Sequence, residues 1–370
     1  MIYFNFEDER LAEMTMAELH WITDEYYAMF PENRSDRLYL FFDEIQLVSG
    51  WERFLRRLMD TENVQIYISG SSAKMLSREI ASSMRGRSIE ETVYPFSFRE
   101  FLKSQEIELP QKISRVDKNL RSLLENKSIQ YIFQGGFPEA QQLSLHDRHL
   151  LLQGYVDTVI FRDIVERYNA TNVVALRKLT RHLLQHPGSK FSINKFYHVL
   201  KSGGIKVSKT TLHDYLAYLQ DAFLIYVVTI HSQSDRQRMV NPIKTYVCDS
   251  GLAAAYSTSQ SIEQGHLLEN CILMELHRQK AHIEYINTPT GYEVDFYAHY
   301  PNGINYLIQA SADVSAPETL KRESRALIDV DPSIQAHKRL IINISSEKII
   351  EENGFTLFLL PLWKWLLEPS

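Results

Sequence analysis

The sequence has only two cysteines in 370 residues, Cys248 and Cys271. Two scattered cysteines do not make a disulfide framework, and neither belongs to a cluster with zinc spacing, so they fit a reducing cytoplasm. No apolar run approaches the ~18 residues that a membrane span requires. The N-terminus shows no basic leader followed by an apolar stretch. We therefore predict a cytoplasmic protein without a membrane span.

The sequence also lacks a net positive charge. Its 40 Lys and Arg are outnumbered by 46 Asp and Glu, which gives a net charge of −6 and a pI of about 6.1. A global basic field for nucleic acid is thereby excluded, and any DNA contact must come from a local patch. The composition is 44% hydrophobic and 23% charged, as in ordinary globular proteins. The length predicts roughly two or three domains.

A continuous apolar run, residues 38–46 (LYLFFDEIQ), ends in two acids. Such a run predicts a strand of a parallel sheet, with Asp43 and Glu44 at its carboxyl end, where α/β sheets bind ligands. This layout is typical of a Walker B strand. Asp43 would hold Mg²⁺, and Glu44 would polarise the water that attacks a γ-phosphate. The alternative is a buried strand that merely ends in exposed acids.

Small polar residues and arginines follow this strand. A second strand is predicted to end in the sequence SGSS, where Ser71 and Ser72 could contact the γ-phosphate. The alternative is an ordinary strand-to-helix turn with a serine N-cap. Arg85 and Arg87 could act as arginine fingers beside a phosphate site, or they could be surface charges, which is the commoner case.

Several segments together resemble a prokaryotic family of AAA+-like P-loop ATPases that carry a winged helix and a restriction-endonuclease-like domain of unknown function. The resemblance covers nearly the whole chain, and its specificity comes from the combination of segments. They are LYLFFDEIQ (38–46), ISGSSAKML (68–76), RGRSIEETVYPFSFREFL (85–102), FQGGFPEA (133–140), NPIKTYVCDSGL (241–252), LEN (268–270) and EVDF (293–296).

The resemblance implies ATP and Mg²⁺ as ligands, but one part of the family pattern is missing. The Walker A loop, G-x-x-x-x-G-K-[ST], which cradles the phosphates, occurs nowhere in the 370 residues. We therefore expect no ATP hydrolysis. We also expect that the start at Met1, inside a strand predicted at residues 2–6, reflects a late gene start or a truncation more than true degeneration.

In this family the Walker A strand lies between two other strands. One resembles the sensor-1 strand of AAA+ ATPases and is the strand predicted at residues 64–69, which ends in SGSS. The other is predicted at residues 88–94. Without the Walker A strand, the two neighbours must pair with each other or leave backbone groups unpaired, at about 1–3 kcal/mol for each buried group. We expect that the gap closes or that the domain is poorly ordered.

The chain beyond the ATPase-like part divides into further regions. Residues 171–240 predict a winged helix-turn-helix, whose third helix could enter a DNA major groove with Lys209 and His213. This helix is only weakly basic, and Asp214 would repel phosphate. A structural or interdomain role is therefore at least as good an interpretation as DNA binding, and the partner of the winged helix could be DNA or another protein.

The last region, by resemblance, has a restriction-endonuclease-like fold. An active nuclease of this type needs an acid on one strand and acid-x-Lys on the next, so that two carboxylates hold Mg²⁺ and the lysine activates water. Asp295 matches the first position, and Glu269 lies on the preceding predicted helix, but Gln309 and Ser311 replace the second acid and the lysine. We therefore predict a degenerate site and no nuclease activity.

These predictions combine into an α/β architecture. We expect a partial P-loop (ASCE-type) parallel sheet with helices in residues 1–105, a helical connector in 106–170, the winged helix in 171–240 and the nuclease-like α/β domain in 241–370. The predicted function is membership of an AAA+-like ATP-binding family without ATP hydrolysis. The alternative is a non-catalytic module that binds DNA or protein.

Overall fold

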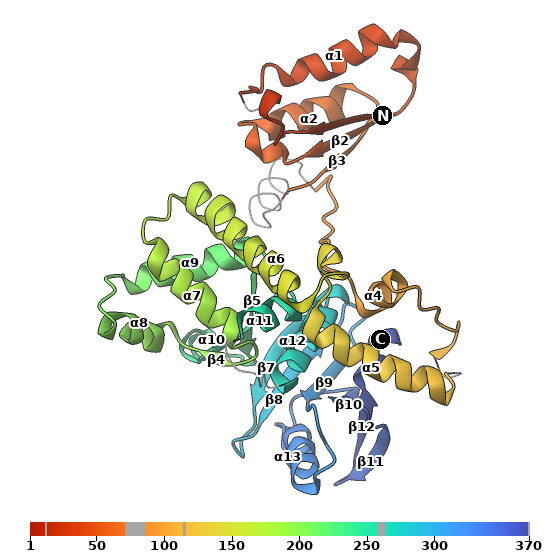
Figure 1. Cartoon of the computed structure of the whole chain (residues 1–370), viewed down its shortest axis with the longest axis vertical. Helices are drawn as coiled ribbons and strands as arrows, with labels where there is room; N and C mark the ends of the chain where they lie inside the picture. The colour runs from red at the N-terminus through yellow and green to blue at the C-terminus, as the bar shows by residue number, and fades with distance from the viewer. Residues whose placement is uncertain (12, 71–85, 114–115, 258–263, 369–370) are drawn as a thin grey trace. The chain divides into compact units, whose positions relative to one another are not determined.

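The computed structural model describes the chain apart from residues 12, 71–85, 114–115, 258–263 and 369–370 (Figure 1). The described chain divides into two units, the first Met1–Thr92 and the second Val93–Gln220 with Leu224–Ser370. Both units are mixed α/β, as predicted. No helix in the described part of the chain combines the length and the apolar character needed to cross a membrane.

The first unit is built on a three-stranded parallel sheet in the order β1-β2-β3. Side chains alternate between its faces, and one face packs with the helices into a core that includes Leu40, Phe42 and Phe54. The elements are β1 (Ile2–Asn5), η1 (Glu9–Leu11), α1 (Leu19–Met29), η2 (Pro31–Ser35), β2 (Leu38–Asp43), η3 (Ile45–Leu47), α2 (Trp51–Thr61) and β3 (Val64–Ile68).

The other face of this sheet is aromatic and partly exposed. Tyr3, Phe41 and Tyr67 lie in register across the three strands. The rings of Phe41 and Tyr67 stack with centroids 4.8 Å apart. Tyr3 is 61% exposed and Tyr67 is 48% exposed. Parallel sheets usually bury both faces, so this exposure is unusual for the strand type.

The strand predicted at residues 88–94 is wrong. These residues form no strand, and Ile89 and Val93 are 97% and 94% exposed. In the described part of the first unit, β3 is the last strand on its side of the sheet, so these strands do not close the gap, which is one of the two alternatives that the sequence predicts. A β-rich sequence forms a strand only where a neighbouring strand offers hydrogen bonds and an apolar surface, and no strand of the described residues pairs with this segment.

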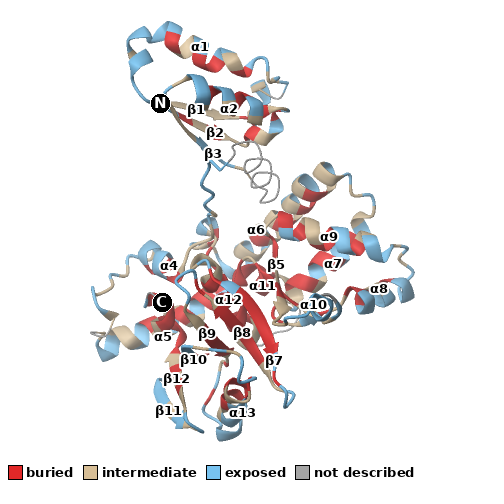
Figure 2. Cartoon of the chain, turned by 180° about the vertical axis from the view of Figure 1, so that it is seen from behind, coloured by how far each residue is buried: buried red, intermediate tan, exposed pale blue. Residues whose placement is uncertain are grey.

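The second unit contains a mixed nine-stranded sheet in the order β11-β12-β10-β9-β8-β7-β5-β6-β4. Its middle strands are buried along almost their full length (Figure 2). The strands are β4 (Lys190–Phe191), β5 (Ile225–Ile230), β6 (Ile243–Val247), β7 (His282–Asn287), β8 (Glu293–His299), β9 (Asn305–Ala310), β10 (Lys338–Asn343), β11 (Lys348–Glu352) and β12 (Phe355–Pro361).

The helices of the second unit begin at strong caps. Ser97 and Glu100 form a reciprocal capping box at α4, and Asn172 and Ser192 cap α7 and α8. The helices are α4 (Phe98–Ser104), α5 (Lys118–Gln134), η5 (Pro138–Ala140), α6 (Leu145–Thr158), the π-helix η6 (Val159–Glu166), α7 (Val173–Gln185), α8 (Ile193–Ser202), α9 (Lys209–Asp221), α10 (Asp235–Val240), α11 (Ser250–Tyr256), α12 (Gln264–Arg278), α13 (Pro317–Ile328) and α14 (Leu362–Leu367).

Three of the sequence segments meet at one point of the second unit. The Phe96 N–H donates to the Gly136 carbonyl at 2.7 Å, and the Gly136 N–H donates to Asp249 Oδ2 at 2.7 Å. The Tyr131 hydroxyl donates to the Phe96 carbonyl at 2.7 Å, and Arg278 donates to the same oxygen at 3.3 Å. The segments that mark the family therefore fix one another across long sequence distances.

Asp249 anchors this junction from inside the protein. It is 5% exposed, and its Oδ1 accepts the Gly251 N–H at 2.9 Å, which caps α11. Burial raises the pKa of Asp249 to about 6, although the backbone N–H groups of Gly136 and Gly251 oppose this shift. The junction leaves no room for side-chain atoms, because a Cβ on Gly136 would lie 2.3 Å from the Phe96 carbonyl oxygen.

We predict that Gly136→Ala lowers the unfolding free energy by about 1–3 kcal/mol, because the added methyl forces the Phe96 backbone away. Gly154→Ala is the matched control, since its Cβ in α6 would meet nothing within 4 Å. A helical Gly→Ala change there should stabilise by roughly 0.5–1 kcal/mol. Urea unfolding of both variants measures the difference, and equal stabilities would contradict the packing account.

Candidate functional site

The second unit brings the four predicted nuclease-like residues to one buried place. Glu269 lies on α12, Asp295 on β8, Gln309 on β9, and Ser311 directly after β9. Each is only 7–8% exposed. Gln309 stands beside Asp295 across the antiparallel β8–β9 pair, and its Oε1 accepts the Asp295 N–H at 3.4 Å. Glu269, Asp295 and Gln309 therefore lie together, whereas the Ser311 hydroxyl donates to the Asp313 carbonyl at 3.3 Å.

A β-bulge sets the direction of Asp295. Glu284 pairs with Tyr297, but Ile286 pairs with Val294, so two residues of β8 stand opposite one residue of β7. Asp295 is one of these two residues. Bulges increase the local twist and re-aim side chains, which explains how an acid inside a buried strand comes to point into a polar cluster.

The cation of this cluster is Lys244 from β6, which the sequence analysis missed. Lys244 is 2% exposed. Its Nζ lies 2.5 Å from Glu269 Oε1, 3.1 Å from Glu293 Oε1 and 3.1 Å from Asp295 Oδ1. Lys244 belongs to the segment NPIKTYVCDSGL, but nothing in its spacing relates it to acids that lie dozens of residues later.

The charges in the cluster depend on one another. Burial alone would lower the pKa of Lys244, but Tyr246 and then the acids Asp295, Glu269 and Glu293 hold it well above its ordinary value. Burial and the charge of Asp295 raise the pKa of Glu269 to about 7, against the opposing effect of Lys244. Burial also opposes ionisation of Glu293, yet Lys244 and Lys190 lower the pKa of that carboxyl.

The oxygens of the cluster are already used. Asp295 Oδ2 accepts the Ala310 N–H at 2.9 Å, and Glu269 Oε1 accepts the Tyr246 hydroxyl at 2.7 Å as well as the Lys244 ammonium. A nuclease Mg²⁺ would require the same inward oxygens. The residues present therefore do not fit a divalent ion, because the ammonium group occupies the position where the metal would bind.

Glu323, a second residue that the sequence analysis missed, explains why a glutamine and not an acid stands at position 309. Glu323 on α13 is 4% exposed, and Arg322 Nη2 lies 2.5 Å from its Oε1. Burial raises the pKa of Glu323, while Arg322 and a hydrogen bond from Gln309 lower it. Gln309 thus uses its oxygen toward Asp295 and its amide toward Glu323, whereas a carboxylate there would face two other carboxylates.

The first unit holds the predicted Walker B residues at the carboxyl end of β2. Asp43 accepts hydrogen bonds from the Tyr3 hydroxyl at 3.1 Å and from the Ser69 hydroxyl. Glu44 follows in the left-handed region (φ 55°) and accepts a hydrogen bond from the Gln46 amide. Hydroxyls and acids therefore lie together where the parallel strands end, which is the edge at which open α/β sheets bind ligands.

The remaining predicted residues of this site contribute less. Ser71, Ser72 and Arg85 lie outside the described residues. Arg87 Nη1 lies 2.8 Å from Asp60, and both side chains are about half exposed, which favours the surface-charge alternative.

The described part of the first unit does not fit ATP. It offers carboxylates for Mg²⁺, but it contains no glycine-rich loop, and the unit's lysine, Lys74, lies outside the described residues. Phosphates are normally held by backbone N–H groups and a lysine. We therefore derive no catalytic step through ATP here.

The region of residues 171–240 is far more basic than its third helix suggested. It contains ten Lys and Arg against three Asp and Glu. The prediction of a weakly basic surface rested mainly on the third helix, with Lys209, His213 and Asp214. All ten basic residues are exposed: Arg177, Lys178, Arg181, Lys190, Lys195, Lys201, Lys206, Lys209, Arg236 and Arg238.

The elements of this region follow the order α7, β4, α8, α9, β5 and α10, and β6 comes directly after it. Strand β6 pairs antiparallel with both β4 and β5. Ser208 accepts the Thr211 N–H at 2.9 Å at the start of α9, and Lys209, Thr210 and His213 are exposed there.

Family models match two parts of the chain. Residues 1–102 match an AAA domain, and residues 125–262 match a domain of unknown function (DUF8612). The chain is 32% identical to the uncharacterized protein MJ1544 of Methanocaldococcus jannaschii over 376 residues, which cover 99% of this chain and 82% of the relative. It is 27% identical to an uncharacterized protein of Haemophilus influenzae, with 83% and 73% covered.

One solved structure is also similar, the Walker-type ATPase paby2304 of Pyrococcus abyssi. The two chains are 16% identical, with a TM-score of 0.38 over 69% of this chain and 83% of that one.

We predict that Lys244→Met lowers the unfolding free energy by about 3–5 kcal/mol at pH 8, because it leaves buried carboxylates without their cation. Loss of the ammonium removes the interaction that lowers the pKa values of Glu269 and Glu293 in the folded state, so both pKa values rise. The folded protein then binds more protons than the unfolded chain, so its stability falls as pH rises. Urea unfolding should show a smaller loss at pH 5 than at pH 8.

Lys190→Met is the matched control for this experiment. Lys190 lies 2.5 Å from Glu293, but its side chain is 41% exposed, so its removal should cost less than about 1 kcal/mol. Equal losses in the two variants, or a Lys244→Met loss that does not change with pH, would contradict the account of the buried cluster.

Proposed function

This chain belongs to the family of the uncharacterized protein MJ1544 of Methanocaldococcus jannaschii, and we propose that it is a DNA-binding, non-nucleolytic member of an AAA-like, ATP-binding family. The observation that carries the proposal is the exposed positive charge of residues 171–240. The chain as a whole has a net charge of −6, so the net +7 of this region stands against −13 elsewhere. Such a charge separation orients the basic region toward phosphates.

The order of elements supports a winged helix-turn-helix in this region. The helices α7, α8 and α9 accompany an antiparallel ladder of β4, β6 and β5 whose middle strand is β6, and the segment between β5 and β6 would form the wing. The start of α9, with Lys209 and His213, would approach base edges in a major groove. The exposed Lys201, Lys206 and Arg236 would contact the phosphates.

The nuclease-like domain, in this proposal, supports DNA binding without cutting. Its assignment rests on the convergence of Glu269 and Asp295 on neighbouring elements. Lys244 forms ion pairs with both acids from within the protein and competes with Mg²⁺ for these oxygens, which would oppose water activation there.

The AAA-like domain in the first unit would, by family resemblance, use Asp43 for Mg²⁺ and Glu44 for the attacking water. We predict that the 370-residue protein keeps its melting temperature when it is mixed with Mg²⁺ and millimolar ATP, because the sequence contains no Walker A loop to hold the phosphates. Saturable binding would instead raise the melting temperature by mass action. Differential scanning fluorimetry measures this. Saturable stabilisation that disappears in Asp43→Asn would show instead that the chain holds a complete nucleotide site.

We predict that the protein binds a fluorescein-labelled duplex with an affinity that falls about 10³-fold or more between 50 and 200 mM salt, as expected for several phosphate contacts. Fluorescence anisotropy measures the binding. Lys201→Glu combined with Lys209→Glu should weaken it at least about tenfold at low salt, because two phosphate-facing charges are reversed. The matched control, Lys348→Glu on β11, reverses an exposed charge outside the region and should bind as wild type does.

Two outcomes would overturn parts of this proposal. If no binding occurs at low salt, the basic region serves an acidic protein partner. If Mg²⁺ or Mn²⁺ produces cleavage that Asp295→Ala abolishes, the nuclease-like site is active and Lys244 takes part in catalysis.

A further inference from the structure

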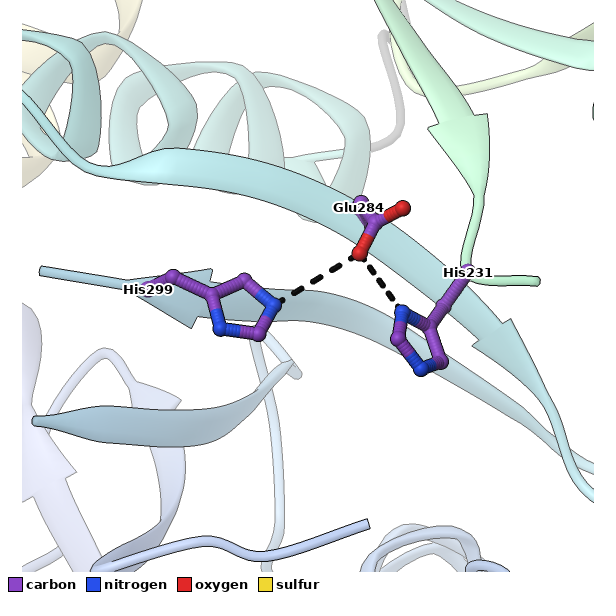
Figure 3. Close-up of side chains that lie close together, drawn as sticks. All are labelled: His231, Glu284 and His299. Atoms are coloured by element: carbon purple, nitrogen blue, oxygen red, sulfur yellow. Dashed lines mark hydrogen bonds and ion pairs between the residues drawn. The ribbon is translucent and has the colours of Figure 1, made fainter. Parts of the chain in front are cut away.

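Two histidines and a glutamate from separate strands meet away from the cluster around Lys244. His231 directly follows β5, and its N–H donates to the Tyr285 carbonyl at 2.7 Å, which continues the parallel pairing of β5 with β7. Glu284 lies on β7, and His299 ends β8. The two imidazoles flank the Glu284 carboxylate (Figure 3).

The ligand atoms are close enough to share one ion. His231 Nδ1 lies 2.6 Å from Glu284 Oε2, and His299 Nε2 lies 3.5 Å from the same oxygen. All three atoms lie within 4.8 Å of one another. Zinc bonds of about 2.0–2.1 Å in a tetrahedral arrangement separate ligand atoms by about 3.3 Å. His299 already meets this separation, and His231, whose side chain is 29% exposed, needs only a small rotation.

A neighbouring amide orients one of the ligands. His299 Nδ1 lies 3.1 Å from Asn305 Oδ1 on β9, within hydrogen-bond distance. With the Nδ1 proton donated to this oxygen, Nε2 carries the lone pair and points toward Glu284. Two electron-rich atoms then face each other, and a cation between them is attracted by both. Metal-binding histidines commonly have such an outer partner, which fixes their tautomer.

The surroundings limit solvent access to the carboxylate. Glu284 is 6% exposed, and the ring of Tyr297 packs against both His231 and His299, with centroids 5.1 and 4.1 Å away. A buried carboxylate requires a compensating charge. The side chains of His231 and His299 are each 29% exposed, so water could occupy the remaining coordination positions of an ion held between them.

We propose that His231, Glu284 and His299 bind a divalent transition-metal ion, with Zn²⁺ as the best fit. Two imidazoles and one carboxylate suit Zn²⁺, Co²⁺ or Ni²⁺, whereas Mg²⁺ and Ca²⁺ prefer oxygen ligands. The ion links the end of β5 to β7 and β8, and thereby holds the chain where the segment carrying Arg236 begins. The proposal does not depend on DNA binding.

The first experiment uses the full chain after treatment with EDTA and dialysis. Isothermal titration calorimetry with ZnCl₂ should show one ion bound per chain, and added Zn²⁺ should raise the melting temperature. Titration with CoCl₂ should produce a visible d–d absorption band that reports nitrogen and oxygen ligation. A protein that takes up no Zn²⁺ and shows no Co²⁺ band overturns the proposal.

Variants then locate the ion. His299→Ala and Glu284→Gln should abolish the Co²⁺ band, and Asn305→Ala should weaken Zn²⁺ affinity about 10–100-fold through loss of orientation. His146→Ala, an exposed histidine on α6, is the matched control and should bind as wild type does. If Glu284→Gln fails to fold, His299→Ala decides, because its side chain is half-buried. Wild-type binding by His299→Ala overturns the assignment.

Discussion

The second unit depends on the ion pairs that the buried ammonium of Lys244 forms with three carboxylates. A lone lysine or a lone carboxylate in this interior would cost several kcal/mol of desolvation, so none of the charged groups is stable there without the others. Lys244 comes from β6, Glu269 from α12, and Glu293 and Asp295 from β8. These elements must therefore assemble together, which joins the basic region to the carboxyl-terminal sheet as one nine-stranded structure.

Apolar patterns in the sequence correctly predicted the strands β2 and β3 of the first unit. The apolar run before Asp43 forms β2, and the alternation after residue 64 forms β3, because both strands find partners and a covering core. The segment at residues 88–94 has a similar composition, yet it forms no strand, since pairing depends on a neighbour that the segment itself cannot supply. Lys244 is missed for a related reason: 51 residues separate it from Asp295, and only the folded sheet brings them together.

The sequence segments that carried the family resemblance have a packing role as well as a chemical one. Gly136 is a glycine because the Phe96 carbonyl occupies the space of a side chain, and Asp249 is an acid because it accepts N–H groups from two segments. Packing and backbone hydrogen bonds explain both residues without a ligand. Motifs can therefore identify a family while indicating little about its chemistry, and function has to be inferred from sites such as the basic region and the buried clusters.

A buried carboxylate needs a compensating charge at each end of β8, and the neighbouring groups that can supply it differ between the two ends. At Glu293 and Asp295 the compensating charge is covalently part of the chain, since the Lys244 ammonium stays protonated over the whole physiological range of pH. At Glu284 the neighbours are imidazoles, which are neutral unless they take up a proton. Neutral imidazoles are ligands in a way that an ammonium is not, because each has a lone pair to give. The first end is thus closed to metal ions by its own lysine, and the second end is chemically suited to receive one.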